Sequence, residues 1–360
     1  MKRITFFLSF FSLLLVKAQQ PLAIPAVLSG TSFNLNVHDT THVFYSGFTT
    51  LTYGINASYL GPTLIMNKGD SVSINVNNFL MDTTTIHWHG MHVSAMNDGG
   101  PHNIILPGAS WQPSFRVRDH ASTYWYHPHL HMMTNMHVTR GAAGMIIVRD
   151  STESLLNLPR TYGVDDYPLV IQSKCFDASK QIQINNASDS VMMVNGTINP
   201  FLNVSAQVIR FRVLNASSER VYQLGFQGNL TFHQIGTDGG LLDAPVALTR
   251  LRLAPGERAE ILVNFSGLNG QTFTLMSFAS ELPGAIYGAT QPGMGPGQTI
   301  TGYSQNPLNG ADFPILQFNV TAPTSTAVIS IPSTLITNTA WPVSSANTTR
   351  TLTFSPVNMG

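Results

Sequence analysis

Apolar and polar residues alternate along much of the chain in short runs that are bounded by glycine, proline and asparagine. Residues 31–37 (TSFNLNV) and 71–77 (SVSINVN) show this alternation most clearly, and each predicts a strand with one buried face. Similar runs at 114–117 and 144–148 predict further strands. Long apolar stretches with the helical period of about 3.6 residues are absent. The pattern therefore predicts an all-β protein built from sandwiches or barrels.

A chain of 360 residues is expected to form two domains of ordinary size. We place the first domain at residues 21–150 and the second at residues 164–321. The breaker-rich stretch NLPRTYG at 157–163 is the predicted linker between them. Strands of the second domain are predicted at 168–172, 193–197, 209–215, 235–242 and 255–263.

Residues 322–360 contain too few apolar positions to form a third core. We interpret them as a linker followed by one strand, at 350–355. Within the second domain, Glu257 and Arg258 are interpreted as an ion pair beside a turn.

Residues 1–18 have the pattern of a secretory signal peptide. A basic start precedes a nearly continuous apolar run at 4–16, and Ala18 is a suitable cleavage site. The run is short for a membrane-spanning helix. We therefore expect an exported protein, periplasmic or extracellular, with no membrane attachment after cleavage. The chain has a single cysteine, so disulfide bonds cannot stabilise the fold.

Charged residues make up only 10% of the chain, against about a quarter in typical proteins, and the formal net charge is +0. No block of lysine and arginine indicates binding of nucleic acid or anionic lipid. Histidine is the chemically informative residue instead. The chain has 12 histidines, and only His233 follows His137.

The strongest chemical signal is a set of two His-x-His pairs, formed by His87, His89, His127 and His129. Each pair follows a run of threonine or aromatic residues that favours a strand. Residues i and i+2 of a strand point to the same side, so each pair directs two imidazoles to one face while Trp88 points to the other. If the two strands face each other, four imidazoles converge. Such a set, without carboxylate or thiolate, favours copper or zinc over magnesium or calcium.

The segments around these histidines resemble the first domain of multicopper oxidases, in particular the branch of bacterial copper efflux oxidases and laccase-like enzymes. The similar segments are HWHGMHV, NDGGPHNIILPG, WYHPHLH and GAAGMIIV. The resemblance implies tandem cupredoxin-like Greek-key β-sandwich domains. In this family a type 1 copper takes electrons from a reductant, phenolic or Cu(I). A trinuclear cluster of one type 2 copper and a type 3 pair then reduces O2 to water.

The resemblance also implies roles for individual residues. His87 is similar to the type 2 ligand of this half of the cluster, and His89, His127 and His129 are similar to type 3 ligands. Asp98, in DGGP, is similar to an acid beside the cluster that assists proton delivery. Asp98 is equally interpretable as a turn residue before the two glycines.

The other ligands of the family lie in an H-x-x-H-x-H motif and an H-C-H motif, and neither motif occurs in these 360 residues. The single cysteine, Cys175, has no neighbouring histidine, and we interpret it as a buried strand residue. The sequence therefore predicts the N-terminal half of a trinuclear copper cluster and no type 1 site. The isolated chain is expected to be incomplete and inactive.

Two functional hypotheses remain. One is a multicopper oxidase whose third domain is not in this sequence, and the other is an exported copper-binding protein without turnover. In the second hypothesis thioethers near the histidines help to hold Cu(I), which imidazole and thioether suit. The methionines concerned are Met91, Met96, Met132, Met133 and Met136. Adaptable packing is the simpler interpretation of these methionines.

Overall fold

The computed structural model of the chain describes residues 19–184, 189–290 and 306–353. The predicted signal peptide lies outside the described residues. Within these ranges, strands dominate and helices are few and short, so the all-β prediction is confirmed.

Two five-stranded sheets face each other in residues 27–149, which we call the first sandwich. One sheet has the order β2 (Val27–Ser29), β5 (Thr63–Asn67), β11 (Gly144–Arg149), β10 (Ser122–His127) and β7 (His87–His89). The other has the order β4 (Phe48–Ile55), β3 (Ser32–Tyr45), β6 (Ser71–Phe79) and β8 (Ser110–Trp111), with β9 (Ser114–Arg116) beside β6. The predicted alternation in β3 and β6 places Leu35 and Ile74 in the core between the sheets.

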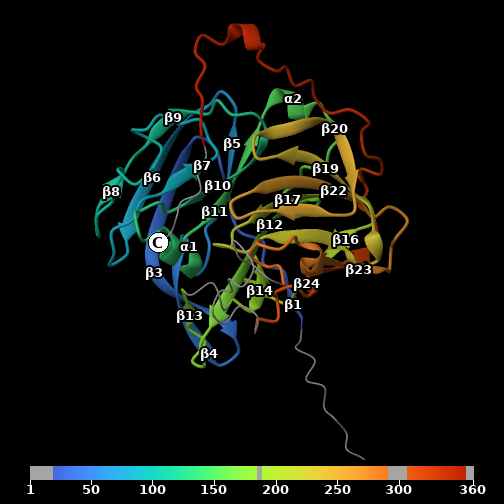
Figure 1. Cartoon of the computed structure of the whole chain (residues 1–360), viewed down its shortest axis with the longest axis horizontal. Coiled ribbons are helices and arrows are strands. Elements are labelled where there is room, and N and C mark those ends of the chain that lie inside the picture. The colour runs from blue at the N-terminus through green and yellow to red at the C-terminus, as the bar shows by residue number, and fades with distance from the viewer. Residues whose placement is uncertain (1–18, 185–188, 291–305, 354–360) are drawn as a thin grey trace, which may run out of the picture.

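Residues 166–321 form the second sandwich, whose two sheets are larger. The six-stranded sheet has the order β1 (Gln20–Pro21), β16 (Pro200–Ser205), β24 (Phe313–Thr321), β23 (Thr272–Ser277), β18 (Tyr222–Phe226) and β21 (Leu251–Leu253). The eight-stranded sheet has the order β15 (Thr197–Ile198), β14 (Val191–Val194), β12 (Asp166–Phe176), β17 (Val208–Asn215), β22 (Arg258–Asn264), β19 (Phe232–Thr237) and β20 (Gly240–Leu248), with β13 (Ile182–Gln183) beside β12. Figure 1 shows the two sandwiches side by side, the first at left.

Two regions of the structure differ from what the sequence pattern predicts. β1 pairs in parallel with β16, so the start of the described chain joins the second sandwich and not the first. Residues 350–353 are exposed and lie in no strand, so this part of the predicted strand is wrong, and residues 354 and 355 lie outside the described residues. An exposed strand needs a neighbouring backbone to pair with, and no described strand lies beside it. Before it, Leu335 packs against the second sandwich, and its amide donates to Asp243 O at 2.8 Å.

The helices are short. α1 (Thr134–Arg140) follows the second His pair, and Gly141 ends it with a φ of 118°. α2 (Ser151–Ser154) begins after Asp150, whose carboxylate accepts from the Glu153 amide. Single 3-10 turns are η2 (Gln227–Asn229), η3 (Ala279–Glu281) and η5 (Val343–Ser345). None of the helices in the described ranges combines the length and apolar character that crossing a membrane requires.

An apolar cluster joins the two sandwiches. Trp125 and Met145 of the first sandwich pack in this cluster with Val170 and Leu214 of the second. This apolar contact is separate from both main cores. Since it contains side chains of both sandwiches, it helps to fix how they pack against each other.

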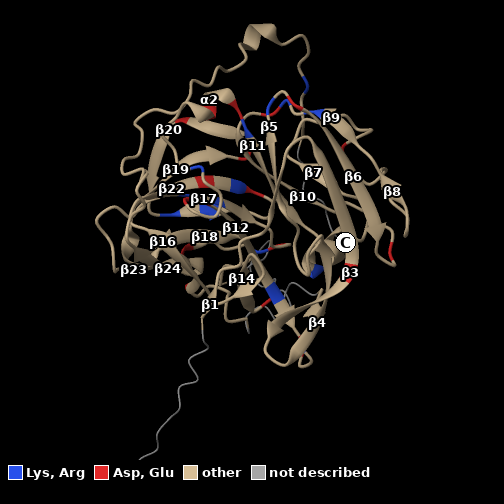
Figure 2. Cartoon of the chain, turned by 180° about the vertical axis from the view of Figure 1, so that it is seen from behind, with Lys and Arg blue, Asp and Glu red and all other residues tan. Residues whose placement is uncertain are grey.

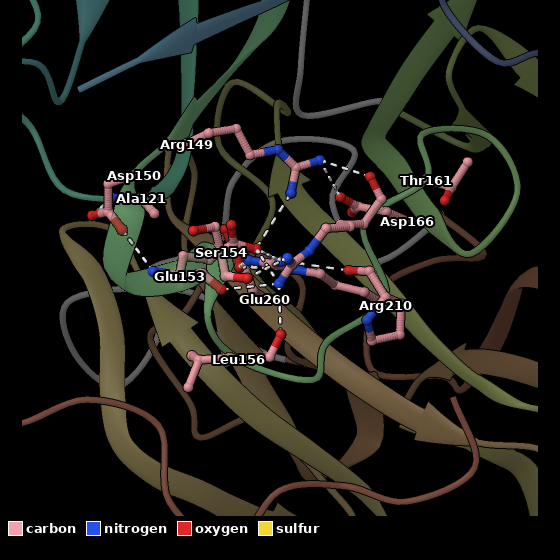
Figure 3. A network of polar contacts seen from close by, with 12 residues as sticks. Ala121, Arg149, Asp150, Glu153, Ser154, Leu156, Thr161, Asp166, Arg210 and Glu260 are labelled. Atoms are coloured by element: carbon pink, nitrogen blue, oxygen red, sulfur yellow. Dashed lines mark hydrogen bonds and ion pairs between the residues drawn. The ribbon is translucent and has the colours of Figure 1, made fainter. Parts of the chain in front are cut away.

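A buried ionic network reinforces the same interface. We call it the interface network, and its members are Arg149, Glu153, Asp166, Arg210, Arg212 and Glu260. Arg212 binds Asp166 and Glu260, each at 2.7 Å, while Arg210 binds Glu260 and reaches Glu153 at 2.6 Å. Figure 3 shows Arg149, Glu153, Asp166, Arg210 and Glu260 together, and Figure 2 shows blue and red segments on β17 and β22 amid largely uncharged strands.

The charges in this network support one another. Burial alone would raise the pKa of the Asp166 carboxyl, but Arg212, Arg210 and Arg149 hold that pKa below its ordinary value. Burial would likewise raise the pKa of Glu260, and Arg210 with Arg212 lowers it. Both carboxylates are therefore ionised partners of the arginines, which is the condition for a buried charge to be tolerated.

Candidate metal centre

The two His-x-His pairs lie on adjacent antiparallel strands. In the pairing of β7 with β10, His127 lies opposite His87 and Trp125 lies opposite His89. Trp88, between the first two histidines, is fully buried in the core of the first sandwich. The period of two in a strand turns its two neighbours to the opposite face.

The four imidazole rings converge on one region. The ring centroid of His87 lies 5.8 Å from His89, 5.7 Å from His127 and 5.3 Å from His129. His127 lies 5.4 Å from His89 and 5.9 Å from His129. His129 follows the end of β10 by two residues, and its amide donates to Thr85 Oγ1 at 2.6 Å. A side chain just upstream of β7 therefore anchors the fourth ring.

The closest approach is between His89 Nδ1 and His127 Nε2, at 3.1 Å. Two imidazole nitrogens that share one metal ion at about 2.0 Å each stand at a similar separation from one another. Trp125 stacks on the His127 ring with centroids 4.0 Å apart, which restricts the ring's rotation. The two rings are hydrogen-bonded to each other in this structure, and their separation also fits a metal that takes imidazole ligands, such as copper or zinc.

Backbone carbonyls set the tautomers of two of the rings. His87 Nδ1 lies 2.9 Å from Asp98 O, and His127 Nδ1 lies 2.8 Å from Pro128 O. A carbonyl oxygen only accepts hydrogen bonds, so Nδ1 carries the proton in each ring and the Nε2 lone pair is left for another partner. Metal-binding histidines are commonly oriented by such a second hydrogen bond.

Burial keeps two of the rings neutral. It lowers the pKa of His89 to about 4, and the Arg258 guanidinium adds to this effect. Burial also holds the pKa of His127 well below its usual value. At neutral pH both rings are therefore in the unprotonated form that binds metal ions.

The arrangement is open on one side. Within the described ranges, no three His, Cys, Asp or Glu side chains are grouped so as to hold a metal ion. A cavity of about 370 Å³ lies in front of the rings, between the two sandwiches. Its lining includes His89, His127, His129, Thr134, Ser217 and Gly256. Three of the four imidazoles line this cavity and His87 lies behind them, an arrangement that suits several ions with one or two ligands each from this face, rather than one enclosed ion.

Asp98 lies beside His87. Its Oδ2 is 3.4 Å from His87 Nδ1, and its side chain is 28% exposed. The next residue, Gly99, has a φ of 75°, and an added Cβ there would lie 1.7 Å from Ile86 O. Only glycine can follow Asp98 in this backbone conformation. Asp98 thus opens a tight turn and also contacts a predicted metal ligand.

The five methionines named with the histidines differ in burial, and Met133 and Met136 are partly buried. Met91 is packed in the core of the first sandwich. Met96 and Met132 are 77% and 87% exposed, so the packing interpretation is wrong for these two. Cys175 is half-buried on β12 opposite Gln183, and burial raises the pKa of its thiol.

The predicted ion pair of Glu257 and Arg258 is replaced by other contacts. Glu257 Oε2 accepts from the Ala254 amide, while Arg258 pairs with Asp238 at 3.0 Å. The reason is that Arg258 begins β22 and its side chain enters the interface between the sandwiches. Trp125 was also missed, although the period of two places it on the same face as His127.

Known proteins are similar to this chain in sequence. Residues 36–153 match the family described as multicopper oxidase. Cell division protein FtsP of Photorhabdus laumondii is 39% identical over 265 residues, which cover 70% of this chain and 56% of that protein. Multicopper oxidase mco of Staphylococcus epidermidis is 36% identical over 251 residues, covering 68% and 56%. The chain spans a little over half the length of these curated relatives.

Solved structures are similar over nearly the whole chain. The laccase-like multicopper oxidase CueO from Ochrobactrum sp. has a TM-score of 0.77 and 30% identity, covering 90% of this chain and 69% of that one. The McoA multicopper oxidase of Aquifex aeolicus has a TM-score of 0.77 and 32% identity, covering 91% and 70%. The predicted tandem cupredoxin-like architecture is confirmed by these similarities.

Proposed function

The chain belongs to the multicopper oxidase family, and we propose on this basis that it supplies one side of the trinuclear copper cluster of an oxidase. In this proposal His87 binds the type 2 copper, and His89, His127 and His129 bind the type 3 pair. When bound, the cluster supplies four-electron reduction of O2 to water, coupled to one-electron oxidation of a phenolic or Cu(I) reductant. The observation that carries the proposal is the 3.1 Å approach of two neutral ring nitrogens among four converging imidazoles.

The surrounding residues present the lone pairs and hold their direction. The carbonyls of Asp98 and Pro128 retain the Nδ1 protons of His87 and His127, so the Nε2 atoms face the site. Trp125 limits rotation of the His127 ring. We assign Asp98 as the catalytic residue of this chain, because its partly exposed carboxylate lies beside His87, where it can transfer a proton.

The proposal limits the part that these 360 residues play. His233 is the only histidine after His137, and the one cysteine lies outside the histidine region, on β12. We therefore propose that the remaining cluster ligands and the type 1 copper come from residues outside this sequence. The chain by itself is then expected to oxidise neither phenols nor Cu(I) at enzyme-like rates. Its basic and apolar beginning supports export to the periplasm or beyond the cell.

Copper binding is the first test. Residues 19–360 are loaded with copper, and the bound metal and the shift in melting temperature are measured for wild type and for His89→Ala/His127→Ala. Wild type should bind copper and be stabilised by it, because a ligand of the native state favours folding. The double variant should lose most of both effects, whereas His38→Ala, on β3, should retain them. Equal copper content and equal melting shifts in all three proteins would contradict the proposal.

Turnover is the second test. Fusion of the chain to the C-terminal part of a similar multicopper oxidase, carrying H-x-x-H-x-H and H-C-H, should give oxygen uptake. His129→Ala in the fusion should abolish this uptake and leave the blue colour of the type 1 copper unchanged. Rapid oxygen uptake by residues 19–360 alone would show that the assignment of roles is wrong.

A copper-binding protein without turnover is the second candidate function. The exposure of Met96 and Met132 favours it, and a similar protein bears the name of a cell division protein and not of an oxidase. In this case Met96→Leu/Met132→Leu should weaken retention of Cu(I), and the fusion should take up no oxygen. If the chain serves an oxidase cluster, the same double variant should leave oxygen uptake by the fusion unchanged.

A further inference from the structure

The ligand-bearing face of β10 is also the face that meets the second sandwich. Thr123, Trp125 and His127 are alternate residues of this strand and share one side. The Thr123 hydroxyl is buried and donates to Glu260 Oε1 at 2.8 Å. Thr123 lies four residues before His127, so this contact with the second sandwich acts on the strand that carries the ligand.

The side chain of Arg258 contacts the backbone of Thr123. Its Nε donates to Thr123 O at 3.1 Å, and its Nη2 donates to Asp238 O at 2.9 Å. The guanidinium also lies against Gly90, where an added Cβ would stand 2.5 Å from Nη2. Gly90 directly follows His89, so one side chain of the second sandwich touches the strands of both His pairs.

Arg258 and Glu260 are alternate residues of β22 and point to the same side. One binds the backbone of Thr123 and the other binds its side chain. The interface network holds Glu260 in turn, because Arg210 and Arg212 both bind its carboxylate. The contact to β10 is therefore made from a rigid and fully paired group.

The first sandwich pairs β10 with β11 over five residues, but it holds β7 by few backbone contacts. β7 has three residues, lies at the edge of its sheet and, among the described strands, pairs only with β10. A short edge strand has few backbone bonds to fix it, whereas a metal site needs its ligands placed to within about 0.5 Å. The position of His89 relative to His127 thus depends on how firmly β10 is held.

We propose that Thr123, Arg258 and Glu260 form a clamp, the Thr123 clamp, through which the second sandwich positions His127 against His89. The three are positioning residues, since none of them faces the cavity in front of the rings. The inference rests on the proposed function, in that the positioned histidines are copper ligands. It assigns the second sandwich, which carries no predicted ligand, a direct part in building the metal centre.

Thr123→Val tests the clamp with little change of shape, because valine lacks only the hydroxyl. Thr50→Val is the matched control: the Thr50 hydroxyl is also buried and donates to Lys180 O at 2.6 Å across the sandwiches, but from β4. Copper affinity and the electron-spin resonance of bound Cu(II) are measured in residues 19–360. We expect Thr123→Val to weaken copper binding about tenfold or more and to change the spectrum, as loss of a ligand's supporting partner does. Thr123→Ser should restore both, and Thr50→Val should match wild type.

A folded Thr123→Val protein with wild-type affinity and spectrum would overturn the clamp, as would an equal change in Thr50→Val. If Thr123→Val does not fold, Arg258→Lys replaces it, because an ammonium keeps the charge but not the planar set of donors. Wild-type copper binding in Arg258→Lys would then overturn the proposal.

Hydrogen exchange of the β10 amides separates this inference from the proposed function. It is measured without copper and should be faster in Thr123→Val than in Thr50→Val. If the wild-type chain binds no copper, the proposed function is contradicted. The exchange rates still test whether the clamp holds β10.

Discussion

His87 and His127 are direct partners across the antiparallel ladder of β7 and β10, so each His-x-His pair contributes one member to the same rung. This rung ends a ladder of only three residue pairs, His87 with His127, Trp88 with Tyr126 and His89 with Trp125. Small displacements at either end of β7 would therefore change the geometry of the candidate metal centre.

A side chain at Gly99 would cause such a displacement at the start of β7. Gly99→Ala should destabilise the chain by about 2 to 4 kcal/mol and weaken copper binding, because its Cβ would meet Ile86 O at 1.7 Å, next to His87. Gly108→Ala is the control, since Gly108 has nearly the same φ, 76°, with nothing within 4 Å of an added Cβ. It should cost only about 1 to 2 kcal/mol for the left-handed conformation. Urea unfolding measures both, and equal costs would contradict the steric explanation.

The interface network should respond strongly to the loss of one arginine. Arg210→Met leaves Glu153 and Glu260 with fewer partners in a buried site and should cost about 3 to 5 kcal/mol of unfolding free energy. Arg250→Met removes an ion pair with the exposed Glu281 and should cost about 1 kcal/mol or less. Denaturant midpoints of the two variants test the difference. A cost for Arg210→Met no larger than that for Arg250→Met would show that the network contributes little.

The copper-free chain should lose stability as the pH falls from about 6.5 to about 4. The pKa of His89 is lowered to about 4 in the folded chain, chiefly by burial, and is near 6.5 when unfolded. Between these values the unfolded chain binds a proton that the folded chain does not, so falling pH favours unfolding. His89→Gln should flatten this dependence, and His102→Gln, in an exposed loop, should not. Urea midpoints between pH 7 and pH 4 that stay constant in wild type would refute the prediction.

The copper-loaded chain should not be intensely blue. Strong blue colour requires a copper-bound thiolate, and Cys175 lies half-buried on β12 with a thiol pKa that burial raises. Electron-spin resonance should resemble type 2 copper, and Cys175→Ser should change neither the absorption nor the resonance. An intense blue band that disappears in Cys175→Ser would assign a copper-ligand role to this cysteine.

Local periodicity explains what was predictable. Leu35 and Ile74 are buried because alternate residues of a half-buried strand face the core, and this spacing is visible in the sequence alone. The same period of two brings His87 and His89 to one face. The convergence of the two His pairs needed only that β7 and β10 be neighbours, which the resemblance to a known family implied.

The contacts between distant segments were not predictable. Arg210 and Arg212 alternate with apolar residues and so suggest an exposed face, yet every residue of β17 is buried. The partners of Arg210, Glu153 and Glu260, lie 57 and 50 residues from it. No local pattern records such pairings, because they depend on how two sandwiches pack. For the same reason the contact of Arg258 with β10 could not be predicted from the sequence.

The balanced charge of the interface network also has a colloidal consequence. Residues 1–18 carry three of the 18 basic residues and none of the 18 acidic ones, so the chain without its predicted signal peptide has a formal net charge of −3. The interface network pairs three arginines with three carboxylates and so leaves this small net charge unchanged. Molecules that carry little net charge repel one another weakly, so concentrated solutions at neutral pH have small electrostatic protection against association. Mildly acidic buffers protonate histidines and bring the net charge closer to zero, so light scattering should record more association there than at neutral pH.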